Sequence, residues 1–279
     1  AIGNAADDAS PPRPPIRHRD DQGTAPLSLI QERLKLLEEF NPGQLTYNTP
    51  SAHWLVGPLD VAKFDLAFQS VMQRQSVLRT TIEERDGESL QVVHDTLDTG
   101  LADVEDLTHL PRDERERVLM HRLNTMIETP FELVGEPLFR ARLFKFEQDR
   151  HALLFMTHHI IWDGWSFDLL YRDLAETYAA LVEARAPDLP ALPVSYGDFS
   201  AWHREWVETE GYARQREFWR RKLGEPYDPG EGGSLDLARG RSKRGTASGR
   251  GLSQSFHIDK ALSDQLRKVG LSMDAPIWD

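Results

Sequence analysis

The chain has 279 residues, 39% of them hydrophobic, which is enough to form one or two packed cores. Its formal net charge of −12 argues against nonspecific binding to nucleic acid or to anionic membranes, and the lack of cysteine excludes disulfides and thiol chemistry. No apolar run is long enough to cross a bilayer and no secretory signal opens the chain, so a cytoplasmic protein is expected.

The first 25 residues have the composition of a linker. Residues 6–15 are rich in proline and in small or acidic side chains, and a charged stretch follows. Such a segment has too few apolar side chains to build a core. We therefore predict a poorly ordered linker over residues 1–25 and a folded lobe that begins at residue 26.

Helices and strands alternate through the first half of the lobe. Apolar residues at helical or alternating spacing predict helices over residues 26–39 and 61–73 and strands over 47–56, 77–84 and 89–94. Asp86 and Gly87 separate the last two strands, and this residue pair is typical of a tight hairpin turn. We expect those two strands to pair with each other.

The second half contains two further strands, over residues 139–146 and 151–158. In the first, Phe139, Ala141 and Leu143 lie on one face, and Arg140, Arg142 and Phe144 lie on the other. The remaining predictions are helices over 112–125, 166–184, 196–223 and 260–269, a loop over 230–251, and a strand over 254–258. Because strands and helices interleave, we predict an α/β sandwich.

The strand over 151–158 leads into the run His158-His159-Ile160-Ile161-Trp162-Asp163-Gly164. Successive strand side chains point to opposite faces, so one histidine should face the interior and the other a cleft. Gly164 permits backbone angles that other residues resist, and Ser166 is a suitable cap for the helix that follows. A histidine beside a carboxylate at a strand-to-helix turn is suited to proton handling.

Two alternatives fit the histidine pair. Both histidines can bind a metal ion, but opposite strand faces, the lack of cysteine and the lack of HExxH spacing argue against a metal site. Both can also be core residues with satisfied hydrogen bonds, and the seven-residue run alone does not exclude this.

Further segments, in order along the chain, accompany this run. Residues 27–37, 74–81, 156–166 and 194–202 resemble the motifs SxAQxRLWxL, RHExLRTxF, HHxxxDG and YxDFAxW, and residues 129–133 and 137–141 also look like family sequence. The departures are Ile30 and Lys35 in the first motif and Gln75-Ser76 in place of His-Glu in the second. The chain thus resembles the condensation domains of nonribosomal peptide synthetases. HHxxxDG separates it from the heterocyclisation domains and from the oxygenase-recruiting relatives with HRxxxDD, while epimerisation domains share the motif.

The resemblance implies a chloramphenicol-acetyltransferase-like fold, a two-layer α/β sandwich lobe with a mixed, largely antiparallel sheet. It assigns residues 26–252 to the N-terminal lobe and residues 253–279 to the start of a truncated C-terminal lobe. A tunnel would run between the two lobes. We therefore expect the chain alone to be inactive and to associate with itself through the exposed inter-lobe face.

The implied reaction joins a carrier-bound acyl or peptidyl thioester to a carrier-bound aminoacyl group. The resemblance makes His159 the catalytic residue and His158 structural. It places Asp163 in a salt bridge, with Arg79 as the candidate partner, and brings the Gly164 backbone close to the reacting groups. Trp165 and Ser166 are candidates for the tunnel wall.

The implied partners are donor and acceptor carrier domains, which bring the phosphopantetheine arms, and an adjacent adenylation domain. The chain would need no cofactor or metal of its own and would not bind nucleic acid or membranes. Two other functions stay open: a freestanding acyltransferase with HxxxD chemistry, which uses a soluble thioester, and a noncatalytic module that docks carrier domains.

Overall fold

A computed structural model describes residues 14–223 and 256–272. Residues 13–225 form one compact unit, and the end of the chain from residue 226 is grouped separately from it. The elements of the first unit are β1 (Thr24–Pro26), α1 (Leu29–Phe40), β2 (Asn48–Val56), α2 (Val61–Arg74), a 3₁₀ helix η1 (Ser76–Arg79), β3 (Thr80–Arg85), β4 (Glu88–Val93), β5 (Glu105–Asp106), α3 (Arg112–Glu128), β6 (Phe139–Glu147), β7 (Arg150–His158), α4 (Gly164–Val182), α5 (Tyr196–Val207) and α6 (Glu210–Leu223). In the separate unit, the described residues form α7 (Lys260–Ser272).

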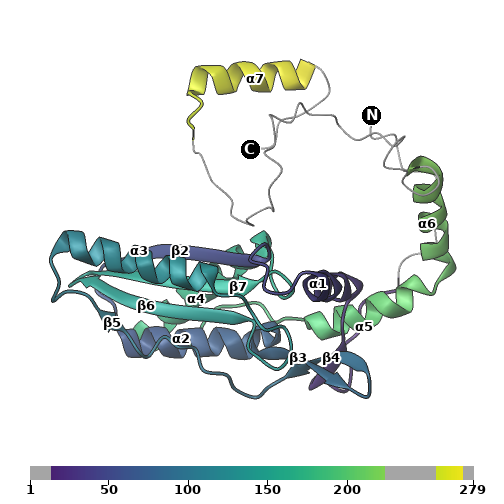
Figure 1. Ribbon diagram of the computed structural model, residues 1–279, viewed down its shortest axis with the longest axis horizontal. Coiled ribbons are helices and arrows are strands. Elements are labelled where there is room, and N and C mark those ends of the chain that lie inside the picture. The colour runs from purple at the N-terminus through teal and green to yellow at the C-terminus, as the bar shows by residue number, and fades with distance from the viewer. Residues whose placement is uncertain (1–13, 224–255, 273–279) are drawn as a thin grey trace. The chain divides into compact units, whose positions relative to one another are not determined.

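Two sheets organise the first unit (Figure 1). The larger has the strand order β2-β7-β6-β5, with antiparallel pairing among β2, β7 and β6 and parallel pairing of β5 with β6. The smaller has the order β1-β4-β3 and is antiparallel. The prediction of a mixed, largely antiparallel α/β fold is therefore confirmed.

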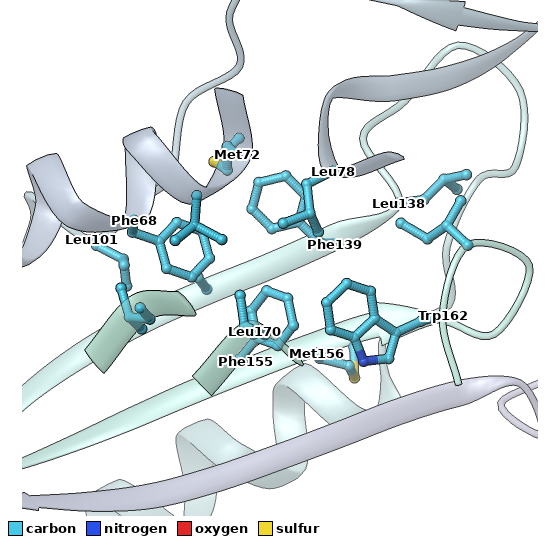
Figure 2. Close-up of a cluster of buried hydrophobic side chains, with 14 of the residues drawn as sticks. Phe68, Met72, Leu78, Leu101, Leu138, Phe139, Phe155, Met156, Trp162 and Leu170 are labelled. Carbon is cyan, nitrogen blue, oxygen red and sulfur yellow. The ribbon is translucent and has the colours of Figure 1, made fainter. Parts of the chain in front are cut away.

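The main core lies between the larger sheet and helices α2 and α4 (Figure 2). Phe139, Ala141 and Leu143 of β6 face this core, as their alternation predicts. Phe144 and Phe146 instead join a smaller cluster under α3 on the opposite face of the sheet. The two central strands are thus covered on both faces, which gives β7 its nearly continuous apolar sequence.

The hairpin between β3 and β4 has the predicted turn. Asp86 and Gly87 have φ angles of 53° and 83°, the left-handed region that a tight two-residue turn requires. Glycine adopts this region without steric cost, and aspartate tolerates it better than most residues.

The N-terminal boundary differs from the prediction. Residues 14–25 are not a free linker, because they pack on α5 and supply most of β1, whereas residues 1–13 lie outside the described residues. The polar composition of this segment suggested disorder, but its side chains find buried hydrogen-bond partners on the lobe. The folded unit therefore begins about a dozen residues before the expected start at residue 26.

The C-terminal elements differ in two places. The single helix expected over 196–223 is two helices, because the chain leaves the helical path at Glu208 and Thr209, where the Thr209 hydroxyl accepts a hydrogen bond from the Tyr212 amide at 3.4 Å and starts α6. The strand expected over 254–258 is not formed at residues 256–258, and the rest of it, with the loop over 230–251, lies outside the described residues. The helix expected over 260–269 is present as α7.

Candidate active site

The histidine pair lies where β7 ends and the chain turns toward α4. The backbone amide of His158 donates to the Leu138 carbonyl at 2.9 Å, and the amide of His159 donates to the Tyr47 carbonyl at 2.8 Å. The chain segments that precede β6 and β2 therefore hold the two histidines from opposite sides.

The turn between β7 and α4 packs into the hydrophobic core. Ile160, Ile161 and Trp162 are buried, and the Trp162 ring meets the Phe155 ring edge-on with centroids 5.5 Å apart (Figure 2). Three consecutive apolar anchors leave the turn little freedom, because each is packed among core side chains. The position of His159 is consequently set by its neighbours rather than by contacts of its own ring.

His158 is a buried, neutral residue. Its Nδ1 accepts a hydrogen bond from the Ile160 amide at 3.1 Å, and its ring lies 6.0 Å from that of Phe131 and 5.9 Å from that of Tyr47. Burial, with a smaller contribution from His159, lowers the pKa of His158 to about 4. Because Nδ1 is the acceptor, the proton of the neutral ring is on Nε2. His158 therefore shapes the turn that presents His159.

His159 has the opposite surroundings and is exposed to solvent at the first position of the turn. The two adjacent histidines thus face different environments, as strand alternation predicts. The imidazole of His159 is therefore open to solvent, whereas that of His158 is enclosed by the core. The core-histidine alternative holds for His158 alone.

Asp163 is the N-cap of α4. Its Oδ1 accepts hydrogen bonds from the Ser166 amide at 2.9 Å and from the Ser166 hydroxyl at 2.6 Å, and its own amide donates to the Ser166 Oγ at 3.3 Å. The hydrogen bond from the Ser166 side chain is the main reason that the pKa of Asp163 lies below its ordinary value, and the nearby His159 adds to this shift. The expected cap, Ser166, is instead the third residue of α4 (N3) and the reciprocal partner of Asp163 in this capping box.

Arg79 does not pair with Asp163. Its guanidinium donates to the backbone carbonyls of Met72 at 3.0 Å, of Gln73 at 3.3 Å and of His94. These bonds join the end of α2 to the end of β4, so the planar group is used as a backbone clamp. The expected salt bridge is thus replaced by two separate interactions, a helix cap at Asp163 and a carbonyl clamp at Arg79.

Gly164 and Trp165 form the outer edge of the turn. Gly164 is the first residue of α4, its φ lies outside the left-handed region, and a Cβ added to it would meet no atom within 4 Å. The expected need for unusual backbone angles is therefore absent, and any steric reason for glycine must come from a molecule that approaches this edge. Trp165 is 74% exposed, so this edge of the turn carries an exposed apolar side chain.

A buried polar network behind the site was not predicted from the sequence. The Ser28 hydroxyl lies 3.0 Å from the Tyr196 hydroxyl, the Gln31 amide donates to Gln91 at 3.2 Å, and the Gln91 amide donates to Ser200 at 3.1 Å. These residues join the first and fourth motif segments through β4. Burial raises the pKa of Tyr196, and the charge of Asp163 adds to this effect. The sequence signal for this network was the presence of uncharged polar residues, Ser28 and Gln31, among the apolar residues of the first motif segment.

The part of the chain that the structure describes has neither a metal site nor a membrane span. No group of three or more histidine, aspartate or glutamate side chains there is arranged to hold a metal ion. No helix within the same residues is long and apolar enough to cross a membrane.

The model of the condensation-domain family matches residues 21–274. The chain belongs to the condensation-domain family. One of the linear gramicidin synthase proteins from Brevibacillus parabrevis is 40% identical over 198 residues, which are 71% of this chain and 4% of that protein. Surfactin synthase subunit 1 from Bacillus subtilis (strain 168) is 30% identical over 263 residues, which are 94% of this chain and 7% of that protein. This condensation-domain chain therefore corresponds to a small part of each of these synthases.

Solved structures show the same fold. The X-domain from teicoplanin biosynthesis has a TM-score of 0.66 and 27% identity, and the match covers 77% of this chain and 46% of that one. The first condensation domain of the calcium-dependent antibiotic synthetase has a TM-score of 0.62 and 22% identity, and that match covers 74% of this chain and 48% of the other. The expected condensation-domain fold is confirmed, and the chain spans about half the length of these solved domains.

Proposed function

We propose that this chain supplies the histidine-bearing lobe of a condensation domain that forms an amide bond. The donor is an acyl or peptidyl thioester, and the acceptor is the amine of an aminoacyl thioester. The observation that carries this proposal is the exposed imidazole of His159, held at the end of β7 by the buried, neutral His158 within an intact HHxxxDG run.

In the proposed reaction the acceptor nitrogen attacks the donor carbonyl carbon. A carbon–nitrogen bond forms, the carbon–sulfur bond of the donor breaks, and one proton of the amine ends on the departing thiol. The exposed imidazole of His159 can hold the amine by accepting its hydrogen bond, and it can take up and return that proton. The anchored turn fixes the backbone position of His159 before substrate arrives, which favours this step over the same reaction in water.

The rest of the turn supports this arrangement. The open space beside Gly164 allows a substrate chain to pass close to the backbone, and the exposed Trp165 offers it an apolar wall. Asp163 acts through the cap of α4 rather than on the reacting atoms. We therefore assign positioning roles to Asp163 and Gly164.

Substrates are proposed to arrive on the phosphopantetheine arms of donor and acceptor carrier domains, with an adenylation domain supplying the activated amino acid. The chain is proposed to hold no cofactor of its own. His159 is exposed in the described part of this lobe, residues 14–223, so the lobe by itself does not form a water-excluded site. We expect it to be inactive unless a second lobe covers the site.

The test places His159→Ala in the complete domain and measures amide formation between loaded carriers by mass spectrometry. His109→Ala, which removes an exposed histidine far from the site in sequence, is the matched control. We expect the first variant to lose amide formation and the control to retain it. Near-normal turnover by His159→Ala would refute the assignment.

A second function is a noncatalytic module that docks carrier domains; the intact HHxxxDG run argues against it, but one similar structure is of a domain bound to another protein. The X-domain found in complex with OxyB from teicoplanin biosynthesis has 28% identity to this chain and a TM-score of 0.66. In this case the complete domain would bind carriers without forming an amide. A freestanding acyltransferase would instead accept soluble thioesters, so the same assay with carrier-free substrates separates the three possibilities.

A further inference from the structure

Residues 14–24, which we call the entry segment, lie against the first turn of α5 and converge on one carboxylate. Asp198 Oδ1 accepts hydrogen bonds from the Arg19 amide at 3.0 Å, from the Arg19 Nε at 3.2 Å and from the Gln22 side chain at 2.8 Å. Its Oδ2 lies 3.1 Å from the His18 Nδ1. The Asp198 side chain is completely buried, so these donors from the entry segment replace its water.

The entry segment is also held at both of its ends. At the start, the Trp202 indole donates to the Pro14 carbonyl at 2.7 Å. At the end, the Val93 amide donates to the Gly23 carbonyl at 2.8 Å, just before β1 pairs with β4. Both α5 and the smaller sheet therefore contribute to its attachment.

Gly197 gives independent evidence that the first turn of α5 accommodates the entry segment. A Cβ at this position would lie 2.7 Å from the Arg19 Nη2 and 2.9 Å from the Ala25 Cβ. Glycine is otherwise a poor helix residue, and Gly197 is the second residue of α5. The close approach of the entry segment gives a steric reason for glycine here.

We propose that the first turn of α5 is a docking surface for the entry segment, so that the chain which enters the lobe is clamped from Pro14 onward. Asp198 is the central clamp, and Gly197 provides the space for Arg19. The polypeptide before residue 14 then starts from a fixed point on the lobe instead of from a tether that is free as far as Thr24.

The consequence for delivery of the donor rests on the proposed function. An extended chain spans at most about 3.3–3.6 Å per residue, so release of the eleven residues of the entry segment would add up to about 40 Å to the reach of a preceding carrier domain. Clamping shortens that tether and so raises the local concentration of a carrier that can still reach the site. The entry segment would thereby set the path by which the donor approaches.

The docking is measured by electron paramagnetic resonance distances on the 279-residue chain. Because the chain has no cysteine, Asp20→Cys and Arg117→Cys introduce a unique pair of exposed spin-label positions. Two variants disrupt the contact from opposite sides: Arg19→Ala with Gln22→Ala removes donors of the entry segment, and Gly197→Ala removes the space on α5. Arg17→Ala in the segment and Gly211→Ala in α6 are the matched controls, since a Cβ at Gly211 meets no atom closer than 3.7 Å.

We expect a narrow distance distribution in the labelled parent and in both controls, and a broad one in both disrupting variants. A broad distribution in the parent, or a narrow one in both disrupting variants, would overturn the proposal. Hydrogen exchange on the unsubstituted chain is a second test that does not depend on how the variants fold. The Arg19 amide should exchange at least about tenfold more slowly than an unstructured amide. Exchange of this amide at the rate of an unstructured one would also overturn the proposal. Neither measurement uses amide formation, so failure of the proposed function would not be mistaken for failure of docking.

Discussion

Replacement of Asp163 by alanine distinguishes a helix cap from a buried salt bridge. Asp163 accepts two hydrogen bonds from Ser166 and is exposed, so its loss removes a cap and leaves no buried charge unpaired. Loss of such a cap costs about 1 kcal/mol of unfolding free energy, within a range of about 0.5–2 kcal/mol. For a domain of this size, that corresponds to a decrease in melting temperature of about 2–4 °C.

The assay is thermal unfolding at neutral pH of the unsubstituted chain, Asp163→Ala and Asp163→Asn. Asparagine is as good a cap as aspartate, so Asp163→Asn should lose less than the alanine variant, and its remaining loss measures the interaction of the charge with the N-terminus of α4. Hydrogen exchange in the first turn of α4 should rise in Asp163→Ala and change little in Asp163→Asn. This pattern would locate the effect at the cap.

A much larger loss would refute this account of Asp163. Removal of one partner from a buried salt bridge costs about 3–5 kcal/mol, which would lower the melting temperature by about 6–20 °C. If both variants showed such a decrease, Asp163 would have a cationic partner, and the capping geometry would not explain its role.

Three further predictions concern the same turn. His159→Ala should change the unfolding free energy by no more than about 0.5 kcal/mol, because the side chain is exposed, and calorimetry on this chain checks that value. The pKa of His158 is about 4 in the folded chain and about 6.5 in the unfolded chain, so between pH 4 and pH 6.5 the unfolded chain binds a proton that the folded chain does not. The free energy of unfolding should therefore fall by up to about 3 kcal/mol as the pH drops from 6.5 to 4. The variant His158→Asn keeps an acceptor but does not titrate, so denaturant titrations should show no such pH dependence for it. Gly164→Ala should leave the melting temperature unchanged or slightly higher, because alanine favours the helix, yet it should lower amide formation in the complete domain; an unaltered kcat/KM would show that no substrate passes this edge.

Local patterns in the sequence determined much of the fold. The alternation of Phe139, Ala141 and Leu143 with Phe144 predicted which side chains of β6 face each layer, and the pair Asp86-Gly87 predicted the hairpin turn. The opposite surroundings of His158 and His159 also followed from alternation. These features depend on neighbours within a few residues, so backbone geometry alone constrains them.

Tertiary structure decided the partners of the polar groups. The sequence could not show that Arg79 binds backbone carbonyls, that Asp163 caps α4, or that Asp198 holds a segment almost 180 residues away. A charged side chain has several possible partners along the chain, and burial selects among them by removing the water that would otherwise satisfy each group. The same selection ordered residues 14–25, whose composition predicted disorder, because the lobe offered their donors a buried carboxylate.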